Sequence, residues 1–213
     1  MLARIKDKVD TDALYILERL RHCGYQAVFV GGCVRDSLLD KSPKDWDIAT
    51  DATPEEIEAT FPRTTPVGKA FGVILVHRSG KSFEVATFRS ETDYTDGRRP
   101  DHVTYAGARE DAMRRDFTIN ALMYDPLEDQ LLDYVGGESD LKQGLLRTVG
   151  VPQERFSEDH LRPLRAVRFA ARMGLDIEQA TFHAMQVSAP DTVHISGERI
   201  GEELSRMFTE GGG

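Results

Sequence analysis

The spacing of apolar residues changes near residue 150, and this change limits the folds that are open to the chain. Before it, short apolar runs typical of strands alternate with helical patterns, whereas from Ser157 onward only helical spacing recurs. The Gly-Val-Pro sequence at residues 150–152 separates the two parts, as Gly and Pro often do between elements. We therefore expect an α+β chain, with a mixed sheet and helices over residues 1–150 and an all-helical domain over residues 151–213.

The first part of the chain contains several well-marked elements. Regularly spaced leucines predict a helix over residues 11–22. Another helix begins after Thr53, because Pro54 suits the first helical turn and Glu56 completes a capping box with Thr53. The other predicted elements are strands over 25–30 and 46–50, a short helix over 34–39, a strand hairpin over 71–76 and 83–89, a polar loop over 91–102, a helix over 110–122, a strand pair over 122–125 and 130–134, and a short helix over 138–143.

The composition excludes several classes of protein. No apolar run approaches the roughly 20 residues that a membrane span needs, and the charged first residues are unlike a secretory signal. Two cysteines in 213 residues cannot form a disulfide framework. The net charge of −9 argues against non-specific coating of nucleic acid, although most of the 27 cationic side chains are arginine, which suits bidentate contacts to phosphate. We expect a cytoplasmic protein that does not enter a membrane.

Two aspartates flank the single tryptophan in the sequence Asp45-Trp46-Asp47. On a strand, residues i and i+2 project from the same face, so the two carboxylates would lie side by side with Trp46 on the other face. Mg²⁺ takes hard oxygen ligands and is often held by one or two carboxylates together with substrate phosphates. The pattern therefore indicates a metal site at Asp45 and Asp47, with a solvated strand end as the alternative.

A Gly-Gly turn precedes these aspartates in the sequence. Gly31 and Gly32 follow an apolar run and precede a predicted helix, an arrangement in which the backbone can approach a phosphate closely. Arg35 lies within the first turn of that helix, where it can add a charge-assisted contact. A plain strand-to-helix turn would use the same glycines, but their closeness to the aspartates suggests a triphosphate beside a metal ion.

Three further residues are candidates for the same site. Glu84 lies on the second strand of the predicted hairpin and would be a third carboxylate if that strand neighbours the aspartates; the alternative is an exposed strand glutamate. Arg114 and Arg115 lie near the start of the predicted helix over 110–122, where cations oppose the helix dipole. This unfavourable placement suggests a bound anion at Arg115, with a surface salt-bridge cluster as the alternative.

Charged residues at i+3 and i+4 spacing form one stripe of a predicted helix in the second part of the chain: Asp159, Arg162, Arg165, Arg168 and Arg172. Asp159 accepts and Arg162 donates hydrogen bonds, so together they could meet the Watson–Crick edge of a base. Arg165 and Arg168 could continue toward the phosphates. The alternative is a solvated face with an internal Asp–Arg bridge, which four arginines against one aspartate fit less well.

Taken in order, these motifs resemble the class II tRNA nucleotidyltransferases, also called CCA-adding enzymes, and the related bacterial poly(A) polymerases. The resemblance spans nearly the whole chain, and five ordered segments are far more specific than any one of them. The segments are Gly31-Gly32-Cys33-Val34-Arg35-Asp36, Asp45-Trp46-Asp47-Ile48-Ala49-Thr50, Arg114-Arg115-Asp116-Phe117-Thr118-Ile119-Asn120-Ala121, Glu158-Asp159-His160-Leu161-Arg162 with Arg165-Ala166-Val167-Arg168-Phe169, and Ile195-Ser196-Gly197-Glu198-Arg199-Ile200 with Glu202.

The resemblance implies a nucleotidyltransferase head of the DNA polymerase β type, followed by a helical neck. It implies that Asp45 and Asp47 bind Mg²⁺ and catalyse the transfer, with Glu84 assisting. It also implies that Asp159 and Arg162 select C or A through protein hydrogen bonds, with no nucleic-acid template. The residues implied to hold the nucleotide are Gly31, Gly32, Arg35 and Arg115 in the head and Asp159, Arg162, Arg165 and Arg168 in the neck.

The reaction that the resemblance implies is nucleotidyl transfer, in which an RNA 3′ hydroxyl attacks the α-phosphate of CTP or ATP at a two-metal site and pyrophosphate leaves. The partners would then be CTP, ATP and the 3′ end of tRNA. In the family, a loop between head motifs is associated with addition of the terminal A. The corresponding loop over 91–102, with Tyr94, Asp96, Arg98 and Arg99, is near full length and favours CCA or A addition over CC alone.

Two alternatives stay open. Bacterial poly(A) polymerases carry a basic-aromatic stretch where this chain has Gly68-Lys69-Ala70-Phe71, and the departure disfavours long A tails without excluding them. Members of the family also continue into body and tail domains that grip RNA, whereas this sequence stops just past the neck motifs. The second alternative is therefore a nucleotide-binding fragment that is inactive without its RNA-binding domains.

Overall fold

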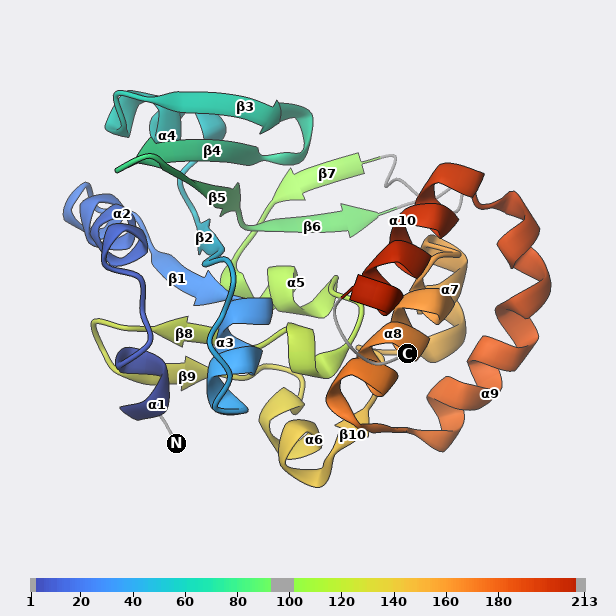
Figure 1. Cartoon of the computed structure of the whole chain (residues 1–213). Coiled ribbons are helices and arrows are strands. Elements are labelled where there is room, and N and C mark those ends of the chain that lie inside the picture. Colours follow the sequence, from blue (N-terminus) through green and yellow to red (C-terminus); the bar gives the residue numbers. More distant parts are fainter. Residues whose placement is uncertain (1–2, 93–101, 210–213) are drawn as a thin grey trace. The chain divides into compact units, whose positions relative to one another are not determined.

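The computed structural model describes residues 3–92 and 102–209 (Figure 1). The helices are α1 (Ala3–Lys6), α2 (Thr11–His22), α3 (Gly32–Leu38), α4 (Pro54–Thr60), α5 (Ala108–Met113), α6 (Gly137–Gln143), α7 (Pro152–Glu158), α8 (Arg162–Met173), α9 (Gln179–Ser188) and α10 (Gly197–Thr209), with 3₁₀ helices η1 (Lys69–Phe71), η2 (Thr118–Asn120) and η3 (Ala189–His194). The strands are β1 (Ala27–Val30), β2 (Ile48–Thr50), β3 (Thr64–Gly68), β4 (Val73–Arg78), β5 (Lys81–Thr87), β6 (Arg89–Thr92), β7 (His102–Tyr105), β8 (Met123–Asp125), β9 (Gln130–Leu132), β10 (Leu145–Leu146) and β11 (Asp176–Ile177).

The chain folds into two compact units. The described residues of the first unit are 3–90, 103–114 and 120–135, and those of the second are 91–92, 102, 115–119 and 136–209. The chain therefore passes between the units more than once, so that Arg114 and Arg115 belong to different units although they are adjacent in sequence. The expected division into a domain over 1–150 and a domain over 151–213 stays a prediction.

A seven-stranded sheet forms the centre of the first unit, with the strand order β3-β4-β5-β2-β1-β8-β9 (Figure 1). Strands β2 and β5 are parallel, and every other neighbouring pair in this sheet is antiparallel. This mixed sheet with its helices confirms the predicted α+β fold class. Because β2 lies between β1 and β5, the segment that carries the two aspartates enters the sheet at its middle strand.

The register of the central strands fixes which side chains share a face of the sheet. Ile48 on β2 lies opposite Phe29 on β1 and Val85 on β5, and all three side chains are fully buried. Successive residues of a strand point to opposite faces. Glu84, which precedes Val85 on β5, therefore belongs to the other face, where its side chain is exposed.

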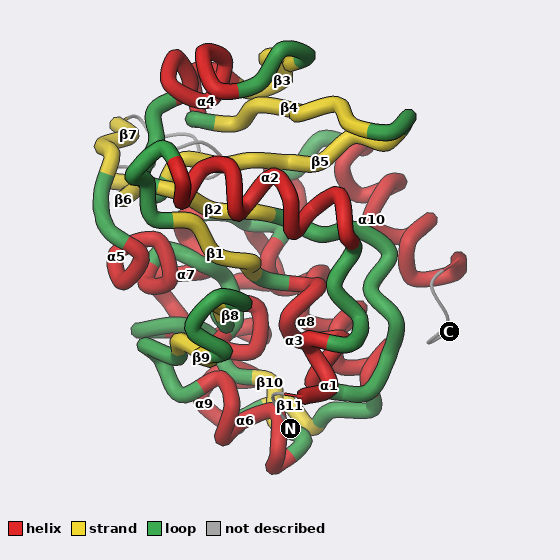
Figure 2. The backbone as a smooth tube through the Cα atoms, turned by 90° about the vertical axis from the view of Figure 1, so that its left-hand side faces the viewer, coloured by secondary structure: helices red, strands yellow, loops and turns green. Residues whose placement is uncertain are grey.

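Helices α2 and α4 pack against this sheet, α2 on β1 and β2 and α4 on β4 and β5 (Figure 2). The α2 helix confirms the prediction over residues 11–22, and its buried positions recur at helical spacing. The capping box of α4 is confirmed as well. The Thr53 side chain accepts a hydrogen bond from Glu56 N at 3.4 Å, and the Glu56 carboxylate accepts one from Thr53 N at 2.7 Å.

The helix predicted over residues 110–122 is wrong. The structure has α5 over Ala108–Met113, then an irregular segment and the short helix η2. Phe117 forms an isolated β-bridge with Thr148, and Thr118 N donates a hydrogen bond to Arg147 O at 2.9 Å. These backbone bonds to residues about thirty positions away replace the bonds that a continued helix would make.

Several strands were missed by the sequence patterns. Strand β3 is mostly exposed and contains Pro66, so it lacks the apolar alternation that predicts a strand. Strands β6 and β7 form a two-stranded sheet at the two ends of the segment predicted as a polar loop. Strand β11 pairs in parallel with β10, which corrects the expectation that only helices follow Ser157.

The second unit is mainly helical, and α8 lies at its centre. Helix α8 packs against α7, α10 and the β10–β11 pair. Phe169 of α8 meets the fully buried Phe117 edge-on, with ring centroids 5.8 Å apart. Such an aromatic contact adds about 0.5–1.5 kcal/mol to the gain from burial. It holds the segment 115–119 onto α8.

The charged stripe that was predicted on one helix is divided between two elements. Helix α7 ends at Glu158, Asp159 has the extended angles φ −144° and ψ 107°, and α8 begins at Arg162. Pro163 explains the break, because its ring is compatible with the first turn of a helix but not with a helix that continues through it. Asp159 therefore lies just before the helix that carries the arginines, which corrects the predicted single stripe.

Candidate active site

Asp45 and Asp47 lie immediately before the middle strand of the sheet and not within it. Strand β2 begins one residue after Asp47, whose carbonyl oxygen accepts a hydrogen bond from Val30 N at 3.1 Å. Trp46 is 6% exposed, and its ring packs edge-on against Phe29 with centroids 4.8 Å apart. Asp45 is exposed and Asp47 is half-buried. The indole therefore lies in the core, whereas both aspartates keep access to solvent, and the predicted shared face of Asp45 and Asp47 stays a prediction.

Glu84 on β5 lies level with Asp47, which directly precedes β2. Ile48 and Val85 are partners in the parallel β2–β5 pair, so the residues before them are neighbours on the same face. Within the described residues, neither Asp45 nor Glu84 makes a hydrogen bond or ion pair through its carboxylate. In that part of the chain, no group of three His, Cys, Asp or Glu side chains gathers closely enough to hold a metal ion. The register thus places Glu84 beside Asp47, and the three carboxylates do not form a metal-binding cluster within the described residues.

The Gly31-Gly32 turn connects β1 directly to α3. Gly31 has φ 73° and ψ −125°, a conformation that residues with a Cβ avoid, and its N–H donates to Leu122 O at 3.0 Å. A Cβ on Gly32 would meet only Nη2 of Arg35, at an ordinary contact distance of 3.8 Å. The fold therefore requires glycine at position 31, whereas the surroundings of position 32 leave room for a Cβ.

Arg35 is buried rather than presented at the surface, with 3% of its area exposed. Its Nε and Nη2 donate to Asp36 Oδ1 at 2.8 and 2.6 Å, and its Nη1 contacts Asn120 Oδ1. These bonds tie α3 to η2. Sequence reasoning missed Asp36 and Asn120 as partners, although both lie within the matching motifs. The predicted contact of Arg35 with a nucleotide stays a prediction.

A buried thiol near Asp47 was also missed. Cys33 is 2% exposed, and its Sγ donates to Val30 O at 3.2 Å. Burial, reinforced by the charge of Asp47, raises the pKa of the Cys33 thiol to about 12. The thiol is therefore neutral at pH 7 and adds no charge beside the aspartates. Its place directly after Gly32 is the sequence signal that could have indicated this proximity.

The structure removes one argument for an anion at Arg115. Arg114 is the C-cap of α5, and its Nε donates to Asp111 Oδ1 at 2.9 Å. The two arginines thus follow the C-terminal end of a helix, where the dipole favours cations. Arg115 is half-buried. Its predicted nucleotide contact stays a prediction, without support from the helix dipole.

Asp159 is held by donors from the second unit. Its Oδ1 accepts from Leu161 N at 3.0 Å, and its Oδ2 accepts from Arg199 Nη2 at 2.9 Å. Its carbonyl oxygen accepts from Arg162 N, also at 3.0 Å. The Asp159 carboxylate therefore has a fixed orientation just before the first residue of α8.

Arg162 is 8% exposed and is bound to α7. Its Nη1 donates to Arg155 O at 2.8 Å and to the Glu158 carboxylate. Its Nε and Nη2 make no hydrogen bond within the described residues, so donors remain for a ligand.

Arg165 and Arg168 also have acidic partners inside the second unit. Arg165 donates from Nε and Nη2 to Asp116 Oδ2 at 3.0 and 2.7 Å. Burial lowers the pKa of Arg165, but the charge and hydrogen bond of Asp116, together with the charges of Glu203 and Asp159, leave the pKa above its ordinary value. Arg168 Nε donates to Glu203 Oε1 at 2.6 Å, and both residues are less than a twentieth exposed. The arginines that outnumber acids in the sequence stripe are therefore balanced by acids from other segments.

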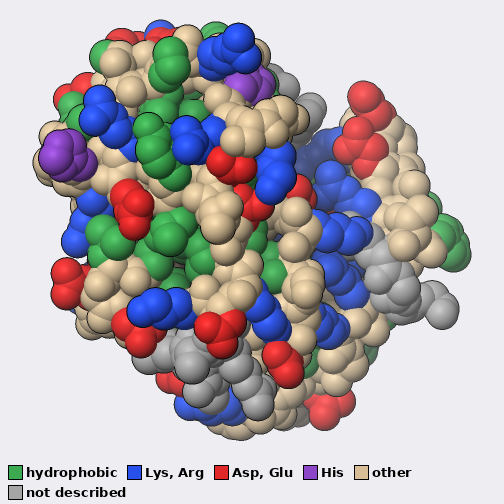
Figure 3. All heavy atoms as spheres, turned by 60° about the vertical axis from the view of Figure 1, so that its left-hand side comes forward, with side chains coloured by type: hydrophobic (Ala, Val, Ile, Leu, Met, Phe, Trp, Pro, Cys, Tyr) green, Lys and Arg blue, Asp and Glu red, His purple; other side chains and the backbone are tan. Residues whose placement is uncertain are grey.

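Some predictions concern residues outside the described ranges or the surface as a whole. The four loop residues associated with terminal A addition, Tyr94, Asp96, Arg98 and Arg99, lie outside the described residues, so that preference stays a prediction. On the surface shown in Figure 3, Lys and Arg side chains are spread over the face, with acidic side chains among many of them. No helix in residues 3–92 and 102–209 has both the length and the apolar character to cross a membrane.

Two family models match the chain. Residues 27–147, more than half of the chain, match the poly A polymerase head domain. Residues 174–213 match a model described as the probable RNA and SrmB-binding site of polymerase A.

The chain is similar in sequence to CCA-adding enzymes. The enzyme of Oceanobacillus iheyensis is 48% identical over 194 residues, which are 91% of this chain and 48% of that enzyme. The enzyme of Bacillus licheniformis is 47% identical over 197 residues, which are 92% of this chain and 49% of that enzyme. The chain thus spans about half the length of the relatives that it matches.

Solved structures agree with this comparison. The Bacillus stearothermophilus CCA-adding enzyme in complex with CTP has a TM-score of 0.84 and 41% identity, covering 92% of this chain and 47% of that one. A tRNA nucleotidyltransferase complexed with a primer tRNA and an incoming ATP analogue has a TM-score of 0.74 and 30% identity, covering 89% and 55%. With its head-domain match, its sheet and its five ordered motifs, the chain belongs to the family of poly(A) polymerase head domains and CCA-adding enzymes.

Proposed function

We propose that the chain is the catalytic head and nucleotide-selecting neck of a template-independent RNA nucleotidyltransferase. It adds C and/or A, taken from CTP and ATP, to the 3′ end of tRNA. The observation that carries the proposal is the position of Asp45 and Asp47 directly before β2, the middle strand of the sheet. This strand pairs with β1, which leads into the Gly31-Gly32 turn. That arrangement occurs in a chain 48% identical to a CCA-adding enzyme.

The aspartates fit a divalent metal ion that binds together with substrate. Asp45 and Asp47 supply hard oxygen donors, and the Asp45 carboxylate has no partner within the described part of the chain. Mg²⁺ commonly takes one or two carboxylates and completes its coordination with phosphate oxygens and water. When bound, such ions stabilise the charge of the transferring phosphate and activate the attacking hydroxyl. We therefore assign Mg²⁺ to Asp45 and Asp47, with Glu84 as a neighbouring carboxylate.

The residues of the Gly31-Gly32 turn bind the triphosphate in this proposal. Without a Cβ at Gly32, a phosphate oxygen can approach the backbone N–H groups at the start of α3. Arg35 and Arg115 contribute positive charge, and for Arg35 the bond to Asp36 fixes the direction of the guanidinium. Donors that are already oriented need no reorganisation when charge develops during the transfer.

Asp159 and Arg162 select the base in this proposal. On their Watson–Crick edges, cytosine and adenine each offer an amino donor beside a ring-nitrogen acceptor, whereas uracil and guanine offer a carbonyl acceptor beside a ring N–H donor. Asp159 supplies acceptor oxygens whose direction is set by Arg199 and Leu161, and Arg162 supplies the unused donors Nε and Nη2. Arg165 and Arg168 lie further along α8 and are proposed to contact the rest of the nucleotide.

The test is an extension assay. A tRNA that ends at its discriminator base is incubated with the 213-residue chain, Mg²⁺ and CTP, ATP or both, and the product length is read on a sequencing gel. A stop after one to three added nucleotides, in an order set by the nucleotides present, supports the proposal. A long ladder with ATP alone supports the poly(A) polymerase alternative. Binding of CTP and ATP without any extension supports the alternative of a nucleotide-binding fragment.

The first prediction concerns the aspartates. Asp45→Asn and Asp47→Asn should each lower the extension rate by on the order of 10²–10³-fold, because each removes a charge at the reacting phosphate. Asp7→Asn is the matched control, since Asp7 is exposed elsewhere in the first unit and should leave the rate unchanged. Thermal unfolding of all three variants checks that the fold is intact. Full activity of either variant would overturn the assignment of the metal site.

The second prediction concerns base selection. Arg162→Ala should lower the preference for C and A over U and G by about tenfold or more, because a paired base contact contributes about 1–3 kcal/mol of discrimination. The ratio of misincorporation to correct addition is measured, because it does not depend on the fraction of folded protein. Arg172→Ala, on the same helix, is the control. An unchanged ratio for Arg162→Ala would remove Arg162 from the selecting pair.

A further inference from the structure

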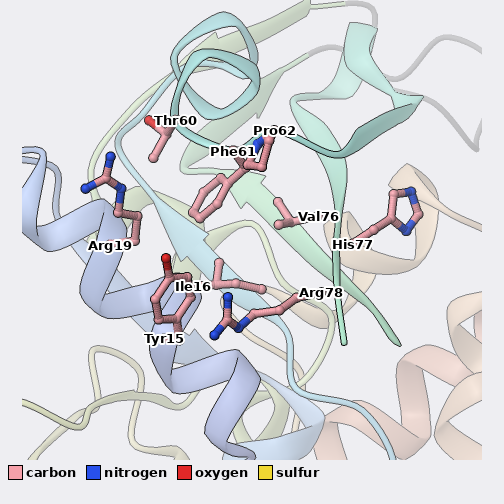
Figure 4. Close-up of a pocket in the computed structure, with 9 residues that line it drawn as sticks. All are labelled: Tyr15, Ile16, Arg19, Thr60, Phe61, Pro62, Val76, His77 and Arg78. Atoms are coloured by element: carbon pink, nitrogen blue, oxygen red, sulfur yellow. The ribbon is translucent and has the colours of Figure 1, made fainter. Parts of the chain in front are cut away.

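The first unit contains a pocket that the proposed function does not use. It lies between α2, the end of α4 and β4, and has a volume of about 230 Å³ (Figure 4). Val76, which lines it, shares a face of the sheet with Ile74, the partner of Val85. Glu84 points to the opposite face. The pocket therefore lies on the side of the sheet away from the carboxylates of the proposed active site.

The inner part of the pocket is apolar. Ile16, Phe61 and Val76 line it, and their exposed fractions are 0%, 6% and 2%. Figure 4 shows the Phe61 ring and the Ile16 and Val76 side chains directed into the same space. An apolar cavity of about 150 Å³ is sufficient for benzene, and pockets for drug-sized ligands start at about 300 Å³. The volume of about 230 Å³ therefore suits one aromatic ring with a short side chain.

The rim of the pocket is cationic. Arg19 is exposed, and within the described residues its guanidinium makes no hydrogen bond or ion pair. Arg78 lies 3.4 Å over the centre of the Tyr15 ring and donates from Nε to Asp12 Oδ1 at 2.9 Å. None of the residues that line the pocket, all of which are described, is acidic. The rim therefore favours an anion, and Arg19 is its guanidinium without an acidic partner in the described part of the chain.

The other polar groups at the rim are already fixed. The His77 ring is bonded at both nitrogens, Nδ1 with Ser82 Oγ at 2.9 Å and Nε2 with Thr65 Oγ1 at 2.7 Å. His77 therefore contributes a wall and no free donor. Tyr15 is held on one face by Arg78, and its hydroxyl makes no hydrogen bond within the described residues. The pocket thus combines an apolar interior with donors at its rim, among which Arg19 and the Tyr15 hydroxyl make no hydrogen bond within the described residues.

We propose that this pocket binds a small carboxylic acid that carries one aromatic ring. The ring occupies the space between Ile16, Phe61 and Val76, and the carboxylate accepts hydrogen bonds from Arg19 and from the Tyr15 hydroxyl. Burial of the ring supplies the main driving force, and the charged contact distinguishes an acid from a neutral ligand of the same shape.

The test is a titration of the uniformly ¹⁵N-labelled 213-residue chain, followed by amide NMR shifts. The probes are 3-phenylpropionate, its neutral analogue 3-phenylpropanol, and propionate, which lacks the ring. We expect saturable shifts with 3-phenylpropionate at the amides of α2 and β4 that line the pocket, weaker binding of the alcohol, and no saturation with propionate. Equal binding of acid and alcohol, or saturable shifts that map elsewhere, would overturn the proposal.

Three variants make the test specific. Arg19→Gln should weaken 3-phenylpropionate about fivefold or more, the loss expected for one charge-assisted hydrogen bond, and should leave the alcohol unchanged. Arg109→Gln removes an equally exposed arginine outside the pocket and should change neither affinity. Thr60→Phe places a ring at the pocket edge and should reduce binding of both ligands. The amide spectra of the free variants show that each is folded, and unchanged acid binding in Arg19→Gln would refute the role of the cation.

Discussion

At the scale of single residues, the charged side chains of the second unit form pairs that the sequence pattern does not show. Arg162 binds the Glu158 carboxylate, Arg165 binds Asp116, and Asp159 accepts from Arg199. A nucleotide that contacts these residues meets side chains whose directions are already fixed. In the proposed function, selection of a base would depend on the donors and acceptors that the internal pairs leave unused.

The two glycines after β1 lead to a prediction at this scale. Gly31→Ala should destabilise the fold by about 1–3 kcal/mol, because Gly31 combines φ 73° with ψ −125°, a conformation that a residue with a Cβ adopts only under strain. Gly32→Ala should cost much less stability, because its Cβ would meet only the end of the Arg35 side chain. The free energy of unfolding in urea measures both.

The same pair of variants tests the phosphate contact. Gly32→Ala should weaken CTP binding although it folds normally, because the added methyl group occupies the path of the phosphate toward the backbone. Calorimetric titration with CTP measures this. Normal CTP affinity in a stable Gly32→Ala variant would show that the backbone at position 32 does not approach the nucleotide.

The residues of the site were predictable to different degrees. The paired aspartates and the glycine turn follow from local patterns, since they need only neighbouring residues to be recognised. The acidic partners of the arginines were not predictable, because Asp116 and Glu203 lie 49 and 35 positions from the arginines that they bind. The sequence shows which charges exist, and only the fold shows which of them meet.

At the scale of elements, breaks between helices decide where the charged groups lie. Local signals predicted α2 and α4 well, because leucine spacing and a capping box are properties of short segments. The helix over 110–122 and the uninterrupted stripe after Ser157 failed for the opposite reason. In the first place, the backbone of Thr118 bonds to Arg147 instead of continuing a helix. In the second, Pro163 fixes the start of α8. The helical spacing of side chains reveals neither.

A buried ion pair joins α8 to α10 and can be tested as a unit. Glu203→Leu should destabilise the chain by about 3–5 kcal/mol, because it removes the Glu203 carboxylate from the buried Arg168 charge. The double variant Arg168→Met with Glu203→Leu should recover most of that loss, since two apolar side chains need no charge compensation. Urea unfolding measures both variants.

An exposed pair provides the matched control for this prediction. Lys142 and Glu138 lie 2.7 Å apart on α6 with partly exposed side chains. Glu138→Ala should change the stability by no more than about 0.5 kcal/mol. A similar small effect for Glu203→Leu would mean that the Arg168–Glu203 pair does not hold the two helices together.

At the scale of the whole molecule, the path of the chain links segments that a linear division would separate. Residues 115–119 belong to the second unit, where Asp116 binds Arg165 and Phe117 packs on Phe169. The change in periodicity near residue 150 cannot reveal this, because it reports local structure and not the later return of the chain. The mixed sheet was predictable as a class, whereas its strand order was not.

This path leads to a prediction about truncation. A chain that ends at residue 150 lacks Arg165 and Phe169, so Asp116 loses its bond to Arg165 and Phe117 loses its contact with the Phe169 ring. Exposure of a buried phenylalanine costs about 1.5–3 kcal/mol, and the region 115–149 should therefore be cleaved earlier than in the 213-residue chain. Limited proteolysis with mass spectrometry identifies the first cuts. Equal resistance of both chains would show that residues 115–149 do not depend on α8.

The packing of Trp46 has an optical consequence. It is the single tryptophan of the chain, its ring rests on Phe29, and a carboxylate stands on each side of it in sequence. The emission wavelength of an indole depends on the local electric field, and a cation at either carboxylate would change that field. The chain therefore contains an intrinsic fluorophore beside its proposed metal site, and its colour and intensity can follow metal and nucleotide loading without an added label.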